Sequence, residues 1–175
     1  AESIELIRGP ETLVYGSNTI AGIINILSPI YRQKKLDNPK YKLLMGHESS
    51  NQSNLLSANI NIPLKSYQIF TNYTKRTARD QSSPLGDLKN TALMKDDFTF
   101  AITKFGQKNY TTLQIKDFAM DYGIPGSPEG HIDGVDLKLK NLSQKLLYHS
   151  DINFSSFKFL ELEQCYIKYG HQEFV

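Results

Sequence analysis

The sequence predicts a mainly β protein whose largest part is one antiparallel sheet with an apolar and a polar face. Apolar and polar residues alternate strictly from Leu56 to Ile62, so Leu, Ala and Ile side chains share one face while Ser and Asn share the other. Short joins that contain turn residues alternate with long loops, as in a meander of antiparallel strands. Both observations favour a sheet that separates two different environments.

The first part of the chain, residues 1–29, has a different pattern from the rest. Ile4–Arg8 predicts a short strand, which Gly9-Pro10 ends, and Pro10 suits the first position of a helical turn over Glu11–Val14. Gly16 and Gly22 are expected at bends, because glycine tolerates backbone angles that other residues resist. Ile23–Leu27 predicts a second, mostly buried strand. Residues 30–39 are expected to be a linker.

From residue 40 to residue 175 the period-two pattern predicts seven strands. They are Tyr41–Glu48, Leu56–Ile62, Tyr67–Arg79, Asp97–Phe105, Tyr110–Asp121, Val135–Ser150 and Phe157–Gln172. The joins at 63–66, 106–109 and 151–156 are short, and those at 80–96 and 122–134 are long. The paired carboxylates Asp96-Asp97 are expected in a turn.

The length of these strands raises the possibility of a membrane barrel. Most of them exceed the usual soluble strand of about 5–6 residues, and a transmembrane strand needs about 9–11 residues. Aromatic residues lie near strand ends, where an interfacial girdle would place them: Tyr41, Tyr67, Phe105, Tyr110, Tyr148 and Phe157. A soluble β-sandwich also alternates, so periodicity alone leaves both architectures open.

Composition excludes some classes of function. Lys and Arg total 20 and Asp and Glu total 18, which gives a net charge of +2 and no basic cluster suited to nucleic acid. The single cysteine, Cys165, permits no internal disulfide and no cysteine-based metal site, and we expect it to be a small buried residue. No apolar run is long enough for a transmembrane helix and no signal peptide is visible. We expect no cofactor, and no residues form a recognisable catalytic arrangement, so an enzyme is not expected.

The opening stretch, residues 2–28, resembles the end of the plug domain of TonB-dependent outer-membrane receptors. The resemblance rests on Ile4-Glu5-Leu6-Ile7-Arg8-Gly9-Pro10, Tyr15-Gly16, Ala21-Gly22 and Ile23-Ile24-Asn25-Ile26 at fixed spacing. Thr19 stands where the family often has Ala, and Ala21 where a second Gly is common. Weaker likeness continues through residues 121–139 and 160–174.

The resemblance implies an antiparallel transmembrane β-barrel wall, preceded by the C-terminal part of a small α+β plug domain. Residues 1–29 would then end the plug and residues 40–175 would begin the barrel. Such barrels have about 22 strands, so we expect this chain to be a fragment of a longer receptor. The residues expected to shape the plug end are Glu5, Arg8, Gly9, Pro10, Tyr15, Gly16, Gly22 and Asn25.

The resemblance also implies the activity and the partners. Receptors of this family sit in the outer membrane of Gram-negative bacteria and import a scarce ligand, such as a siderophore, haem or a metal. TonB supplies the energy through a contact upstream of residue 1. The partners are therefore outer-membrane lipid, TonB and a small extracellular ligand, without nucleic acid. The alternative is a soluble β-rich module that binds a ligand or a carbohydrate.

The long join at 122–134 is the one candidate ligand site. Glu129, His131 and Asp133 lie within it, and imidazole and carboxylate groups suit divalent transition metals. Because His131 is the only histidine of the loop, a metal is not expected there. His47, His149 and His171 are scattered over separate strands and are expected to have no role in the site.

Overall fold

The computed structural model describes residues 3–10, 12, 22–27, 34–127, 130–154 and 156–175. The chain divides into two compact units, Ala1–Lys34 and Lys35–Val175. The first unit contains β1 (Ser3–Ile7) and β2 (Ile23–Leu27), which pair antiparallel over their full length. Both strands were predicted from the sequence. The predicted helical turn over Glu11–Val14 falls mainly outside the described residues.

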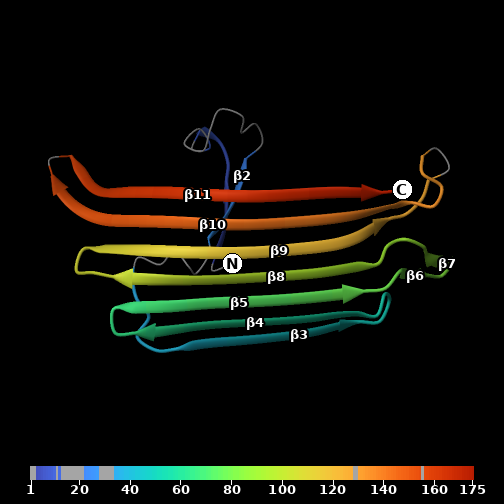
Figure 1. Cartoon of the computed structure of the whole chain (residues 1–175), viewed down its shortest axis with the longest axis horizontal. Coiled ribbons are helices and arrows are strands. Elements are labelled where there is room, and N and C mark those ends of the chain that lie inside the picture. The colour runs from blue at the N-terminus through green and yellow to red at the C-terminus, as the bar shows by residue number, and fades with distance from the viewer. Residues whose placement is uncertain (1–2, 11, 13–21, 28–33, 128–129, 155) are drawn as a thin grey trace. The chain divides into compact units, whose positions relative to one another are not determined.

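The second unit is built on one antiparallel sheet of seven strands in the order β11-β10-β9-β8-β5-β4-β3 (Figure 1). The strands are β3 (Lys40–Glu48), β4 (Ser53–Leu64), β5 (Tyr67–Ala78), β8 (Leu93–Phe105), β9 (Asn109–Ile124), β10 (Val135–Phe154) and β11 (Phe157–Phe174). All seven predicted strands are confirmed. Six of them extend by one or a few residues beyond at least one predicted bound, because strand pairing continues where the sequence alternation has already weakened, and β5 ends one residue before the predicted Arg79.

The joins are sorted between the two ends of the sheet. The short joins between β4 and β5, β8 and β9, and β10 and β11 are at one end, while the long joins between β5 and β8 and between β9 and β10 begin and end at the other, together with the turn at 49–52 (Figure 1). We call these the short-turn end and the loop end. The first long join contains a small hairpin that the sequence did not predict, formed by β6 (Gln81–Ser83) and β7 (Gly86–Leu88).

The register gives the sheet two chemically different faces. The apolar face carries Leu56, Ala58, Ile60 and Ile62 of β4 and the side chains that pair with them on neighbouring strands. The polar face carries Ser57, Asn59 and Asn61 with their partners. The predicted alternation of β4 is therefore confirmed, and the register assigns the residues of the other strands to the same two faces, although near the loop end of β10 the polar face carries Leu137 and Leu139 and the apolar face Lys138 and Lys140.

The buried residues of this sheet lie on the opposite face from those of a sheet in a soluble protein, where the apolar face is buried. Every buried residue of the seven strands lies on the polar face: Ser53, Asn61, Gln68, Phe70, Thr99, Ala101, Thr103, Tyr110, Thr112, Leu137, Leu147 and His149. The exposed large apolar side chains of the five inner strands, apart from the terminal Ile124 and Phe154, all lie on the apolar face: Leu56, Leu64, Tyr67, Tyr73, Met94, Phe98, Leu113, Ile115 and Leu146.

Two expectations were wrong. Asp96 and Asp97 lie inside β8 rather than in a turn, and each carboxylate pairs with a lysine, Asp96 with Lys75 and Asp97 with Lys116. Cys165 is exposed rather than buried, because β11 forms an edge of the sheet with a neighbour on one side only. None of the described residues forms a helix with the length and hydropathy of a membrane span.

Candidate functional site

Several of the residues expected to shape the plug end lie in or directly beside the paired strands β1 and β2. Glu5 in β1 is the Cα partner of Asn25 in β2, and the exposed Arg8 follows β1 directly. The side chain of Asn25, together with Tyr15 and Gly16, lies outside the described residues. The structure therefore brings Glu5, Arg8 and the Asn25 backbone to one short hairpin.

Two glycines in this hairpin occupy backbone angles that suit glycine. Gly9 has a φ of 81° and its carbonyl accepts hydrogen bonds from the Thr12 N–H (3.1 Å) and the Thr12 hydroxyl (2.8 Å). Gly22 has a φ of 135°, and a Cβ there would lie 3.0 Å from the carbonyl oxygen of Ile7. Pro10 continues the turn after Gly9. The break that Gly9-Pro10 was expected to impose on the first strand is confirmed.

Polar side chains of the polar face pair with one another across neighbouring strands. The hydroxyls of Thr103 and Thr112 are 2.8 Å apart and both residues are buried. The Lys116 ammonium lies 3.4 Å from the Asp97 carboxylate, whose side chain is 16% exposed. A face on which buried polar groups satisfy one another can border water or a second polar surface, because few donors or acceptors are left unpaired.

One polar acceptor of this face has no such partner. Asn61 is 4% exposed, and its side-chain oxygen has no hydrogen bond with any residue that the structure describes. A buried oxygen of this kind normally requires a donor from water, a ligand or another chain segment. Asn61 therefore carries a buried acceptor that the described residues leave unpaired.

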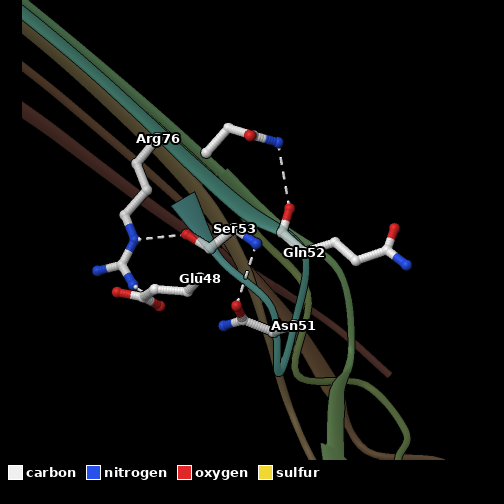
Figure 2. Close-up of polar contacts among 6 residues, drawn as sticks. Glu48, Asn51, Gln52, Ser53 and Arg76 are labelled. Atoms are coloured by element: carbon white, nitrogen blue, oxygen red, sulfur yellow. Dashed lines mark hydrogen bonds and ion pairs between the residues drawn. The ribbon is translucent and has the colours of Figure 1, made fainter. Parts of the chain in front are cut away.

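A cluster of hydrogen-bonded polar side chains lies at the loop end of β3, β4 and β5 (Figure 2). The Arg76 guanidinium donates to the Ser53 hydroxyl (3.1 Å) and to the Glu48 carboxylate (3.0 Å). The Ser53 N–H in turn donates to the Asn51 side-chain oxygen (3.1 Å). These contacts link three strands and fix the turn between β3 and β4.

The two long joins are connected through Asn90, which has a φ of 59°. Its side-chain N–H donates to the Ile124 carbonyl (2.9 Å), and the Gly123 N–H donates to the Ala92 carbonyl (3.1 Å). A Cβ at either Gly123 or Gly134 would overlap the Asn90 side chain, so the two loops approach closely at this point. Sequence analysis did not single out Asn90. The only signal of this contact in the sequence was the pair of glycines, Gly123 and Gly134, that Asn90 approaches.

The structure describes two of the three predicted ligand residues. Glu129 lies outside the described residues, and His131 and Asp133 are exposed. The His131 carbonyl accepts hydrogen bonds from the Ser127 and Gly134 N–H groups, so His131 contributes to the loop through its backbone. Within the described ranges, no group of three His, Cys, Asp or Glu side chains could hold a metal ion.

His149, expected to have no role, lies at the centre of a cluster at the short-turn end of the polar face. Its ring stacks between Tyr110 (4.9 Å between centroids) and Phe159 (5.4 Å). Its two nitrogens lie 3.3 Å from a Glu161 oxygen and 3.4 Å from an Asp151 oxygen. Because the carboxylates flank opposite sides of the ring, they bracket His149 rather than converging on one ligand position.

Sequence comparison adds no family to this description. No protein-family model matches the sequence.

Proposed function

We propose that the chain is part of a TonB-dependent outer-membrane receptor, with the seven-stranded sheet as a segment of its barrel wall. The β1–β2 hairpin would be the end of the plug domain that occupies the lumen. The parent receptor would import a scarce extracellular ligand with energy coupled through TonB. One observation carries the proposal: on the five inner strands the buried side chains lie on the polar face, and the exposed large apolar ones, apart from the terminal Ile124 and Phe154, lie on the other.

This distribution fits a wall between lipid and a polar lumen. In a soluble sandwich the apolar face would pack on a second sheet, yet large side chains there are exposed, such as Leu113 at 45% and Leu146 at 43%. Outer-membrane barrels turn apolar residues outward and polar residues inward. Hydrogen-bonded pairs such as Thr103 and Thr112 suit the inward face.

The height of the apolar surface also supports a membrane span. Tyr67, Lys104, Thr111 and Tyr148 are Cα partners in one row across β5, β8, β9 and β10. Lys75, Asp96, Ala119 and Lys140 form a second row. Tyr67 to Lys75 is nine residues, within the range of about 9–11 that a tilted transmembrane strand needs. On the apolar face of these four strands, the residues between the two rows are mostly apolar. Thr71, Asp117 and Gln144 are the polar exceptions.

The joins and the edges agree with the same architecture. Outer-membrane barrels have short turns on the periplasmic side and long loops outside, and this sheet has short turns at one end and both long joins at the other. The sheet is open, with β3 and β11 as its edges. Unpaired strand edges are not tolerated in lipid, so a wall function requires further strands to pair with both edges.

A nitroxide scan of β4 tests this proposal. In a Cys165→Ser background, single cysteines from Leu56 to Ile62 would be spin-labelled in the full chain, in micelles of a neutral detergent. Labels on the apolar face should be accessible to oxygen, which partitions into hydrocarbon, and inaccessible to a polar nickel complex. Labels on the polar face should show the reverse or be shielded from both.

The scan also separates the proposal from a soluble ligand- or carbohydrate-binding module. In such a module the apolar-face labels would be shielded from oxygen and nickel alike, and this result would contradict the wall function. The family assignment has a separate test in the parent gene, which should encode the start of a plug before this region and further strands after it. A complete soluble domain in its place would contradict that assignment.

A further inference from the structure

Two open pockets adjoin each other where β3, β4 and β5 approach the loop end. The first, of about 620 Å³, is lined by His47, Ser49, Gln52, Asn54, Thr77, Ala78 and Arg79. The second, of about 560 Å³, is lined by Met45, Gly46, His47, Asn54, Leu55, Leu56, Lys75 and Thr77. They share His47, Asn54 and Thr77, which are on the apolar-face side of the register. Together they form one continuous depression, which we call the rim groove.

The charged groups of the rim groove are cationic. Arg79 and Lys75 contribute to its lining, and no Asp or Glu is among the residues that line either pocket. A third pocket shares Ser49, Gln52, Ala78 and Arg79 with the first and also includes Asp80 and Asp87 in its lining. Acidic residues therefore adjoin the Arg79 end of the rim groove, but the charged side chains that line the groove itself can accept an anion.

The cations keep free bonding capacity. The Arg79 guanidinium has no hydrogen bond or ion pair with the described residues, although its backbone N–H donates to the Asn51 carbonyl (2.8 Å). Lys75 has a loose ion pair with Asp96 at 3.9 Å, and its side chain is 47% exposed. Hydroxyl and amide groups of Ser49 and Gln52 lie around Arg79 as further donors.

The part of the rim groove that is farther from the loop end is apolar and continues into the apolar face. Met45 and Leu56 are Cα partners, 69% and 38% exposed, and both line the second pocket. A ligand that follows the groove would place hydrocarbon against these side chains and an anionic group beside Lys75 and Arg79. A guanidinium group binds phosphate or carboxylate through a fork of donors, and an ammonium group binds phosphate as a point charge.

We propose that the rim groove binds the phosphate headgroup of an anionic membrane lipid whose acyl chain lies on Met45 and Leu56. This inference rests on the proposed wall function, because only then does the apolar face contact lipid. Lys75 belongs to the row that borders the apolar surface, so the groove lies at the level where hydrocarbon gives way to headgroups.

Native mass spectrometry of the full chain in neutral detergent micelles tests the inference. The probes are phosphatidylglycerol, zwitterionic phosphatidylcholine and the soluble headgroup analogue glycerol 3-phosphate. We expect binding of phosphatidylglycerol in preference to both others. Arg79→Gln and Lys75→Gln should each weaken that binding about fivefold, because a cation at an anionic lipid surface contributes about that factor. Arg79→Lys should retain most of it.

Lys42→Gln is the matched control. Lys42 is an exposed lysine of β3, close to the groove along the chain but on the polar face, so the variant removes the same charge without touching the groove. An equal loss of binding in Lys42→Gln would overturn the inference, because the effect would then follow net charge. Equal binding of glycerol 3-phosphate would also overturn it and would indicate a site for soluble phosphate compounds.

The β4 scan in the same micelles distinguishes the two proposals. If apolar-face labels contact hydrocarbon but phosphatidylglycerol is not preferred, the rim groove inference alone fails. If those labels are shielded from oxygen, the wall function fails and the lipid site fails with it.

Discussion

Gln68 accepts a hydrogen bond of 2.8 Å from the backbone N–H of Leu36, 32 residues earlier in the chain, and both residues are buried. Gln68 is the second residue of β5, at the short-turn end of the polar face. The neighbouring Lys35 ammonium donates to the Lys65 carbonyl in the same region. The segment that follows the first unit is therefore anchored to the sheet before β3 begins.

Removing the Gln68 acceptor should destabilise the second unit. In Gln68→Ala the buried Leu36 N–H loses its partner, and an unsatisfied buried donor costs about 1–3 kcal/mol. The free energy of unfolding, measured by urea denaturation in neutral micelles, should fall by this amount. Gln68→Glu keeps an acceptor and should lose less.

The control for this prediction is Asn72→Ala. Asn72 lies on the same strand and the same face, and its side chain has no hydrogen bond with the described residues. If Asn72→Ala cost as much as Gln68→Ala, the Leu36 contact would not be the cause of the destabilisation.

Gly22 should be intolerant of a side chain. With a φ of 135° and a Cβ only 3.0 Å from the Ile7 carbonyl oxygen, Gly22→Ala combines backbone strain with a steric clash. Strain of this kind costs about 1–3 kcal/mol. Amide hydrogen exchange of β1 and β2 should therefore accelerate. Gly170→Ala, at a glycine with ordinary φ and open space around its Cβ position, should change exchange little, and equal acceleration in both variants would contradict the argument.

Sequence alternation predicted the strands of this protein because period two is a local property of each segment. Leu56–Ile62 shows its two faces without knowledge of any neighbour. The β6–β7 hairpin was missed because strands of three residues, Gln81–Ser83 and Gly86–Leu88, are too short to show a period. Gly86, with a φ of 116°, was the available signal of a tight turn there.

The clusters were harder to predict because they depend on register between distant strands. His149 meets Tyr110 and Phe159 only because three strands pair in one specific alignment. Asn90 reaches Ile124 across the gap between two loops. Residue type alone suggested His131 and Asp133 as ligands, yet loop residues converge only when the backbone turns them toward one point, and these two remain exposed.

The Thr103–Thr112 pair should behave as a unit in a double-mutant cycle. Either Thr→Val change alone leaves one buried hydroxyl without its 2.8 Å partner and should cost about 1–3 kcal/mol. The double variant removes both hydroxyls together and should be close to the stability of the unmodified chain, as judged by urea unfolding. Additive losses in the double variant would show that the two hydroxyls have other partners and do not depend on each other.

Asn90 should control the order of the loop end. Asn90→Ala removes the hydrogen bond to the Ile124 carbonyl and places alanine at a φ of 59°, whereas Asn90→Gly removes the bond and tolerates that angle. A hydrogen bond of about 0.5–1.5 kcal/mol corresponds to a change of about two- to tenfold in the population of the open loop. Limited proteolysis within residues 125–134 should therefore accelerate by that factor in Asn90→Gly and by more in Asn90→Ala. Lys89→Ala, at the exposed neighbouring residue, should leave the rate unchanged. Equal cleavage rates in all three variants would mean that the two long joins move independently. In that case no preformed contact between the joins could help to hold a ligand.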